Sequence, residues 1–320
     1  LFFDDAVAAA QALDITLTKR GKHQGADIPM CGVPVHAAEG YLLNLIRKGF
    51  RVAVCEQLEN PKEAKKRGAK SVVKRGVVRL VTPGTLTEET LLQPRQSNFL
   101  AAFVQVRNQS CLAWVDISTG DMRYSPCPPV RLGPELARLA PAEVLAAEGA
   151  LDETLEIIIE AGAAATELPQ EVFDSTAGAE KICKAYGVGD LSGLGEFSRA
   201  DVAAVSGLIE YLSTTQKGQL PLLRRPVYEA RDDFVAIDAA TRKNLELTQT
   251  LAGERSGSLL SVVDRSVTAA GARLLSHRIT TPSQRLATIE ERASAVEFFC
   301  GQSGLRGAVR TDLKQLPDVE

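Results

Sequence analysis

Apolar and polar residues in the first third of the sequence recur with two periods, which predict a small mixed α/β unit. Residues 37–48 carry an apolar stripe with the spacing of a core-facing helix, formed by Tyr41, Leu42, Leu45 and Ile46. Gly49 follows, where a residue with free φ suits the end of a helix. We also expect a helix over 1–13, a strand at 15–18, a polar loop over 19–27 and a strand over 50–55.

From residue 99 the pattern changes to short apolar runs separated by turn residues, which predicts a second α/β unit. Strands are expected over 99–106, 111–117 and from 122 to 124, with turns at 108–110 and 118–121. A short helix over 135–139 and a short strand over 143–146 follow, before further mixed elements to about residue 219.

From Asp238 onward a helical period dominates. Asp238 and Thr268 are good helix N-caps, and Leu245 and Leu251 are expected on the buried face of the first helix. Short helical runs at 259–264 and after Thr268 follow, and Thr281-Pro282 ends the second of them. A last helix is predicted from an apolar stripe formed by Leu286, Ile289, Ala293, Val296 and Cys300.

These changes of pattern divide the chain into predicted units. A chain of 320 residues is too long for one ordinary domain. We expect α/β units over 1–92 and 93–219, a linker or strand entry over 220–237, and an incomplete all-α unit over 238–320. The expected fold class is therefore α/β plus all-α.

The charge of the chain is distributed unevenly. Residues 1–84 contain 14 Lys and Arg against 8 Asp and Glu, whereas the remainder is acidic and brings the formal net charge to −3. Most of the excess comes from one basic run, made of Lys62, Lys65, Lys66, Arg67, Lys70, Lys74, Arg75 and Arg79. A cationic face on a small domain favours a phosphate-bearing partner, although charge runs are usually solvated surface.

Four short motifs in the basic unit give it a more specific interpretation. They are LTKRG at 17–21, IPMCGVPVH at 28–36, VCEQ at 54–57 and VTPGT at 81–85. In this order and spacing the unit resembles the mismatch-recognition domain of the MutS family of DNA mismatch-repair proteins. The resemblance implies that the loop 30–36 lies against DNA beside a mispair, where Gly32 permits close approach and Pro34 stiffens the loop. The DNA-binding residues expected on this basis are Lys19, Arg20, Met30, Gly32, Pro34, His36, Lys74, Arg75 and Arg79.

In the family a Phe-x-Glu motif reads the mispair: its Phe wedges beside the base and its Glu hydrogen-bonds it. That motif falls just ahead of the segment matched by residues 1–6, so we do not expect it within this sequence. Phe2 and Phe3 are not substitutes for it, because their helical spacing predicts that they are core residues.

The second unit resembles the family's connector domain, which has a ribonuclease H-like fold. The match rests on WVDISTG at 114–120 and, more weakly, on PAEVL at 141–145. In a nuclease of that fold Asp116 would join other carboxylates to hold two Mg²⁺ ions, and Glu143, Glu148 and Asp190 are the available candidates. None of these lies in a recognisable motif, and Asp116 capping the turn that follows it is the favoured interpretation.

The last unit resembles the start of the family's helical lever domain, through NLEL at 244–247, SVVD at 261–264, TAAGARLL at 268–275 and Arg285-Leu286. No Gly-x-x-x-x-Gly-Lys-[Ser/Thr] loop occurs, so no cofactor is expected in this chain, and whether it has enzyme activity is left open. The resemblance implies ATP and Mg²⁺ in a separate ATPase domain of the parent protein. It also implies double-stranded DNA with mispairs or small loops as ligand, a MutL-type partner at the connector, and a homodimer.

The cysteines and the hydropathy of the sequence indicate in which cellular compartment the protein is expected. The six cysteines form no Cys-x-x-Cys pair and the three histidines are far apart, so no metal site is predicted. No apolar run approaches the ~20 residues of a membrane span, and Asp4 and Asp5 lie where a signal peptide is positive. A soluble cytoplasmic protein is expected.

Three functions therefore remain to be compared. The first is a DNA-binding module of a mismatch sensor, acting in the response to DNA damage. The second is a metal-dependent nuclease centred on Asp116. The third is a protein-docking scaffold without DNA contact, which uses the acidic remainder of the chain.

Overall fold

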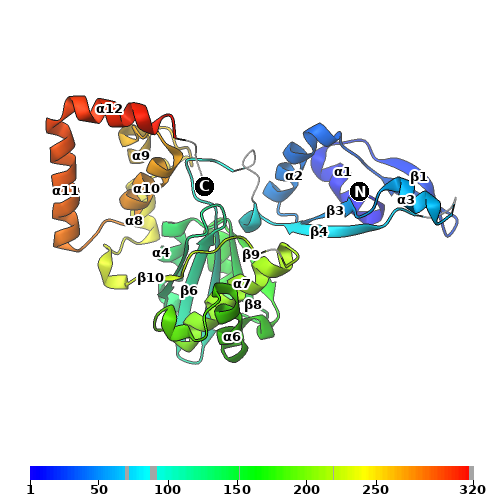
Figure 1. The fold of residues 1–320 in the computed structure, drawn as a ribbon, viewed down its shortest axis with the longest axis horizontal. Helices are drawn as coiled ribbons and strands as arrows, with labels where there is room; N and C mark the ends of the chain where they lie inside the picture. Colours follow the sequence, from blue (N-terminus) through cyan, green and yellow to red (C-terminus); the bar gives the residue numbers. More distant parts are fainter. Residues whose placement is uncertain (69–71, 87–91, 151, 219, 317–320) are drawn as a thin grey trace. The chain divides into compact units, whose positions relative to one another are not determined.

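The computed structural model describes residues 1–68, 72–86, 92–150, 152–218 and 220–316. They divide into two compact units, one of Leu1–Leu91 with Tyr211–Leu220 and one of Leu92–Glu210 with Pro221–Glu320. Figure 1 shows the chain coloured from blue at the N-terminus to red at the C-terminus. Within the described residues, no helix is both long enough and apolar enough to cross a membrane.

The first unit consists of helices, one antiparallel hairpin, and a second antiparallel pair of strands that a helix separates in sequence (Figure 1). Its core lies between the helices α1 and α2, where small side chains of α1 pack near Cys31 and Leu45. The predicted stripe of α2 is confirmed: Leu45 and Ile46 are buried, and Gly49 follows the helix with φ of +83°. The elements are α1 (Phe3–Leu13), β1 (Thr18–His23), β2 (Ala26–Met30), η1 (Val35–Ala37), α2 (Ala38–Arg47), β3 (Val52–Gln57), α3 (Pro61–Lys66), β4 (Arg75–Val81) and η2 (Pro83–Thr85).

A six-stranded sheet forms the centre of the second unit, in the order β10-β7-β6-β5-β8-β9. β5, β6 and β7 form an antiparallel meander, whereas β8 runs parallel to β5, β9 parallel to β8, and β10 parallel to β7. The strands are β5 (Phe99–Val106), β6 (Gln109–Asp116), β7 (Met122–Pro126), β8 (Glu143–Ala147), β9 (Ala164–Leu168) and β10 (Val227–Tyr228).

Helices cover both faces of this sheet. Leu132, Leu136 and Ile158 from α4 and α5 pack against Phe103 and Trp114 on one face. On the other face, Tyr186 of α6 reaches Met122, and Gly207 of α7 leaves room for the ring of Phe173. The elements are α4 (Pro129–Leu139), α5 (Asp152–Glu160), η3 (Gln170–Phe173), α6 (Ser175–Tyr186), η4 (Leu191–Gly193) and α7 (Arg199–Thr215).

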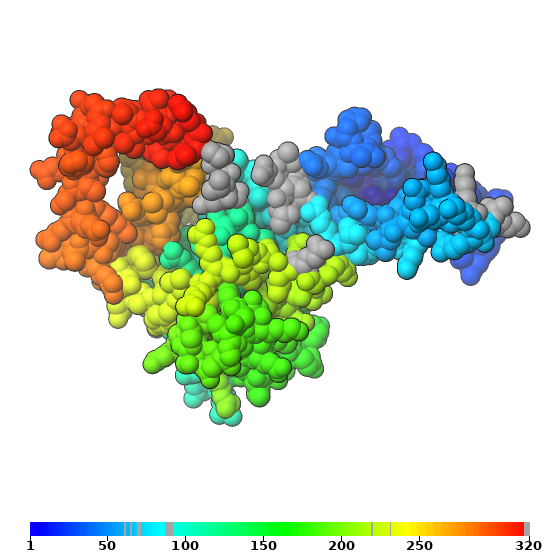
Figure 2. Space-filling view, viewed as in Figure 1, coloured from blue at the N-terminus to red at the C-terminus, as the bar shows by residue number. Residues whose placement is uncertain are grey.

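The end of the second unit is helical, as predicted. The side chains of Asp238 and Thr268 accept N-cap hydrogen bonds from the backbone N–H groups of Thr241 and Gly271. Figure 2 shows α11 and α12 as a continuous orange-to-red surface, and no residue of either helix is buried. The elements are η5 (Arg231–Asp233), α8 (Ala239–Asn244), α9 (Leu259–Val263), α10 (Ala269–Thr280), α11 (Leu286–Gly301) and α12 (Ser303–Leu313).

Several predictions about local structure are wrong. The segment expected as a strand at 15–18 followed by a loop is instead the hairpin β1–β2, which pairs Thr18 with Met30 and His23 with Ala26. The side chains of Phe2 and Phe3 are 42% and 51% exposed, because the buried side of α1 consists of alanines. Leu245 and Leu251 are also exposed, because α8 ends at Asn244 and both leucines lie beyond it.

A cluster of ion pairs joins Arg95, which precedes β5, to the helical region at the end of the second unit. The carboxylate of Asp264, only 5% exposed, accepts hydrogen bonds from Arg95 at 2.8 Å and Arg255 at 2.7 Å. Burial alone would raise the pKa of Asp264, but the hydrogen bonds from Arg95 and Ser266 outweigh it and lower the pKa to about 2.

We expect Asp264→Asn to lower the free energy of unfolding by about 1–3 kcal/mol at pH 7, because two guanidinium groups lose their charged partner. The folded-state pKa lies below the ordinary value of 3.8, so the contribution is present above pH 3.8 and is lost as the pH falls toward 2. Urea unfolding at pH 7 and pH 3 measures the difference. Asp121→Asn, which breaks the exposed pair with Arg224, is the control and should cost no more than about 1 kcal/mol. Equal losses in the two variants would contradict this role for Asp264.

Gly120→Ala tests the turn between β6 and β7. Gly120 has φ of +71°, and a Cβ there would lie 2.1 Å from the carbonyl oxygen of Leu222. We expect a loss of about 3 kcal/mol or more in urea unfolding, since a backbone atom cannot move aside cheaply. Gly149→Ala is the matched control: its φ is +77° but a Cβ meets nothing within 4 Å, so only the left-handed strain of about 1–2 kcal/mol applies. A loss at Gly120 no larger than at Gly149 would show that the close approach is unimportant.

Candidate nucleic-acid interface

The first group of predicted site residues lies on the β1–β2 hairpin. Lys19 and Arg20 are exposed residues of β1, and Met30 ends β2, where its carbonyl accepts a hydrogen bond from Thr18 Oγ1 at 2.8 Å. Lys19 pairs with Asp27 at 2.9 Å, with both side chains well exposed. Such a surface pair is weak, so phosphate oxygens can compete for the Lys19 ammonium.

The loop that follows β2 presents an open surface. Met30 is half-buried and Cys31 is buried, whereas Gly32, Pro34 and His36 are exposed. A Cβ at Gly32 would meet nothing within 4 Å, so the backbone there is open to a ligand. Cys31 fixes the base of the loop, because its N–H and C=O both hydrogen-bond to Leu1.

The second group lies at β4. Lys74 immediately precedes the strand, and Lys74 and Arg75 are both exposed. Arg79 is half-buried in the same strand. The register explains this difference: Val54 pairs with Arg79 and Cys55 with Val77, so a bulge at Val78 interrupts the alternation of faces between Arg75 and Arg79.

The two groups lie on separate two-stranded sheets, and no strand pairing among the described residues joins them. Lys19 pairs with Pro29, next to Met30 along β2, and Lys74 is the sequence neighbour of Arg75, but the nine predicted residues do not form one cluster through strand pairing. In the basic run, Arg67 pairs with Glu59, and Lys62 and Lys66 are exposed. Lys70 and the side chain of Lys65 lie outside the described part of the chain.

Sequence reasoning missed two exposed residues of this surface. Lys22 is a further cation on β1, and predicting that strand would have placed it beside Lys19 and Arg20. Val35, which begins η1 directly after the loop, is 92% exposed and adds apolar surface next to the loop.

Three of the four carboxylates considered for a nuclease, those of Asp116, Glu143 and Asp190, have structural partners. Asp116 accepts hydrogen bonds from the N–H of Ser118 at 3.1 Å and from its Oγ at 2.6 Å, which confirms that it caps the turn. Glu143 accepts from Thr166 at 2.7 Å, and Asp190 from the N–H of Ser192. Among the residues that the structure describes, no three His, Cys, Asp or Glu side chains gather where they could hold a metal ion.

Comparison with known proteins agrees with the motifs. Residues 1–90 match the family model of MutS domain I, residues 98–224 that of MutS domain II, and residues 240–320 that of MutS domain III. The chain is 60% identical over 320 residues to the DNA mismatch repair protein MutS of Roseobacter denitrificans, and 60% identical to that of Dinoroseobacter shibae. The MutS protein of Paracoccus denitrificans is 61% identical over 321 residues.

All of this chain is covered in each of these comparisons, but it spans only 36% of the length of these curated relatives. Three consecutive domain matches and this level of identity over the whole chain leave one assignment: the chain belongs to the MutS family of DNA mismatch-repair proteins.

Proposed function

We propose that this chain is the DNA-contacting and connecting part of a mismatch sensor in DNA mismatch repair. The observation that carries the proposal is the match of residues 1–90 to MutS domain I, together with the exposed cations of the same unit. Lys19, Arg20, Lys74 and Arg75 are point charges suited to phosphate contact, and Arg79 adds a half-buried one. Met30, Gly32, Pro34 and His36 would bring loop backbone to the duplex.

The further parts of the function follow from family membership alone. We propose on this basis that the whole protein reads the mispair with a Phe-x-Glu motif and holds ATP and Mg²⁺ in an ATPase domain. For the second unit we propose a ribonuclease H-like connector that receives a MutL-type partner. The meander β5–β7, followed by parallel β8 and β9, supports this assignment. A homodimer and a cytoplasmic location are proposed on the same basis.

A nuclease function is less well supported. Asp116 and Asp190 are used in turns, and Glu143 is bonded to Thr166. Incubation of the chain with duplex DNA and Mg²⁺, with Asp116→Asn as control, should therefore give no cleavage specific to the wild-type protein.

We expect weak, strongly salt-dependent binding of duplex DNA by this chain. Cation contacts to phosphate supply affinity without sequence information, in the range of ~10⁻⁴–10⁻⁶ M. Matched and G·T-containing duplexes should differ by no more than about threefold, below the ~1–3 kcal/mol of a base-reading contact. Titrations of both duplexes at two salt concentrations measure this. A tenfold preference for the mispair would show that a reading element lies within these residues.

Replacing Lys74 and Arg75 together by Ala should weaken binding equally on both duplexes. The slope of log K against log salt should become shallower by about 0.9 for each phosphate that the variant no longer neutralises. Lys181 and Lys184 on α6, replaced together by Ala, make the matched control, because the net charge changes equally while the first unit is untouched. A similar weakening of DNA binding in the control would show that the loss of affinity reflects the net charge of the chain and not contacts made by Lys74 and Arg75.

Crosslinking tests the position of the loop. His36→Cys should react with a thiol-directed probe tethered to a duplex phosphate, because His36 is exposed at the end of the open loop. Cys55 and Cys300 are exposed free thiols and must first be replaced by Ser. Ser303→Cys, exposed on α12, is the control position. Equal yields at positions 36 and 303 would count against DNA proximity of the loop.

A further inference from the structure

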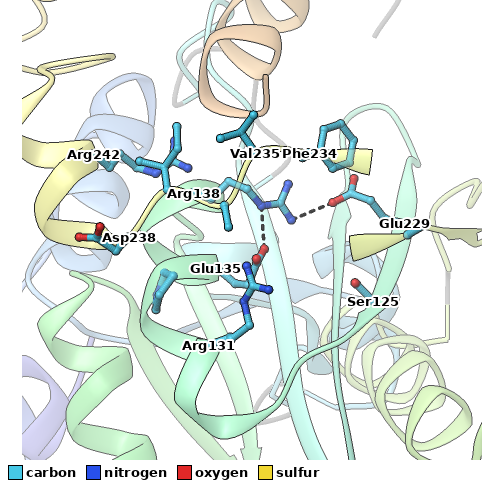
Figure 3. A pocket seen from close by; sticks show the side chains of 13 residues that line it. Ser125, Arg131, Glu135, Arg138, Glu229, Phe234, Val235, Asp238 and Arg242 are labelled. Carbon is cyan, nitrogen blue, oxygen red and sulfur yellow. Dashed lines mark hydrogen bonds and ion pairs between the residues drawn. The ribbon is translucent and has the colours of Figure 1, made fainter. Parts of the chain in front are cut away.

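A cavity of about 230 Å³ lies in the second unit, whereas the proposed DNA-contacting residues belong to the first. Helix α4 forms one wall, the segment from Glu229 to α8 forms another, and Ser125 of β7 also lines the cavity, as Figure 3 shows. The lining is unusually rich in charge and contains Arg131, Glu135, Arg138, Glu229, Asp238 and Arg242.

Arg138 is the central side chain of this cavity. It is 9% exposed and pairs with Glu135 at 2.7 Å and with Glu229 at 2.9 Å, the contacts drawn as dashed lines in Figure 3. Its guanidinium also lies over the ring of Trp114, at 5.2 Å from the ring centroid. Its Nη1 is covered and has no hydrogen-bond partner within the described part of the chain.

Arg242 approaches Arg138 from the opposite wall and has no carboxylate partner among the described residues (Figure 3). It is 8% exposed, its Nη1 donates to the carbonyl of Thr280 at 2.8 Å, and its Nε is covered without a partner. Burial and the charge of Arg138 lower the pKa of Arg242, while Glu135 opposes the shift. The carboxylates of Glu135 and Glu229 pair with Arg138. Within the described ranges, the charge that lacks an ion-pair partner is therefore that of Arg242, and a buried cation of this kind is costly unless a counter-charge is supplied.

We propose that this cavity binds a small oxyanion of the phosphate class between Arg138 and Arg242. Guanidinium groups match the oxygens of phosphate with paired N–H donors, and two of them can bridge one anion. The volume far exceeds the ~30 Å³ share of one water molecule. Both unpartnered nitrogens are covered in this arrangement, so the guanidinium groups must rotate to meet the anion. Because a guanidinium is a rigid plane, this rotation also shifts the contacts of Arg138 with Glu135 and Glu229 and of Arg242 with Thr280, which the bound anion must offset.

The acidic residues of the cavity do not exclude an anion. Glu229 is shared between Arg138 and Arg123, which lies 3.3 Å from it, so two cations offset its charge. Asp238 accepts hydrogen bonds from Thr241 as the N-cap of α8. Glu135 is the acid that most directly competes with an anion, because it pairs with Arg138 and acts on Arg242.

The lone tryptophan supplies a direct readout. Trp114 is the single tryptophan of the sequence and is buried under Arg138, so an anion that moves this guanidinium changes its fluorescence. Titration with inorganic phosphate at constant ionic strength, balanced with chloride, should give a saturable change. Arg242→Gln, which leaves both ion pairs of Arg138 in place, should raise the dissociation constant at least tenfold. Arg306→Gln is the matched control, because Arg306 also donates to a backbone carbonyl but lies on exposed α12; its dissociation constant should equal that of the wild type.

A second variant tests the proposal in the opposite direction. Glu135→Gln removes the competing carboxylate and should tighten phosphate binding about threefold or more, and it serves even if Arg242→Gln does not fold. A fluorescence change that never saturates, or equal dissociation constants in wild type, Arg242→Gln and Glu135→Gln, would overturn the proposal and leave the cavity to buried water only. None of these results depends on binding of duplex DNA, so the two proposals fail separately.

Discussion

The second unit depends on the pairing of β5 with a strand on each side. Residues 100–104 are all buried, and this strand pairs antiparallel with β6 and parallel with β8. A strand buried on both faces must be covered by helices on both, because neither face can be left to water. The helices α4 and α5 on one side, and α6 and α7 on the other, meet this requirement. The position of Trp114 under Arg138 follows, since Trp114 is one residue of β6 on the α4 side.

The sequence predicts this unit well because its signals are strong. The bounds of β5 are those expected, 99–106, since a segment that is apolar except for Gln105 ends in turn residues on both sides. The helix expected over 135–139 is longer than its pattern indicates, because α4 begins at Pro129. A group of prolines looks like a break in the chain, yet proline is well suited to the first turn of a helix.

The prediction of secondary structure from the sequence failed for segments that are not stabilised by burial of apolar side chains. β1 is exposed along its whole length, so no alternation of apolar and polar residues marks it as a strand. The strand β1 is stabilised instead by its backbone hydrogen bonds to β2, and such hydrogen bonds produce no pattern of apolar and polar residues in the sequence. The site residues were predicted from the resemblance to a family, and such a resemblance identifies positions in the sequence but does not tell how exposed their side chains are. That Arg79 is half-buried while Arg75 is exposed depends on a bulge at Val78, and no feature of the sequence announces a bulge.

The ion pairs of Glu229 have a consequence for the order in which this chain is made. Arg123 and Arg138 are synthesised about a hundred residues before Glu229, and β10, which completes the sheet, comes directly with it. During synthesis the strands β5 to β9 can assemble first, with Arg138 paired to Glu135 and the carboxylate of Glu229 not yet made. The emergence of residues 227–229 then adds the edge strand β10 and supplies the carboxylate that Arg123 and Arg138 share. Completion of this unit is thus a late event in translation, as expected where contacts join distant parts of a chain.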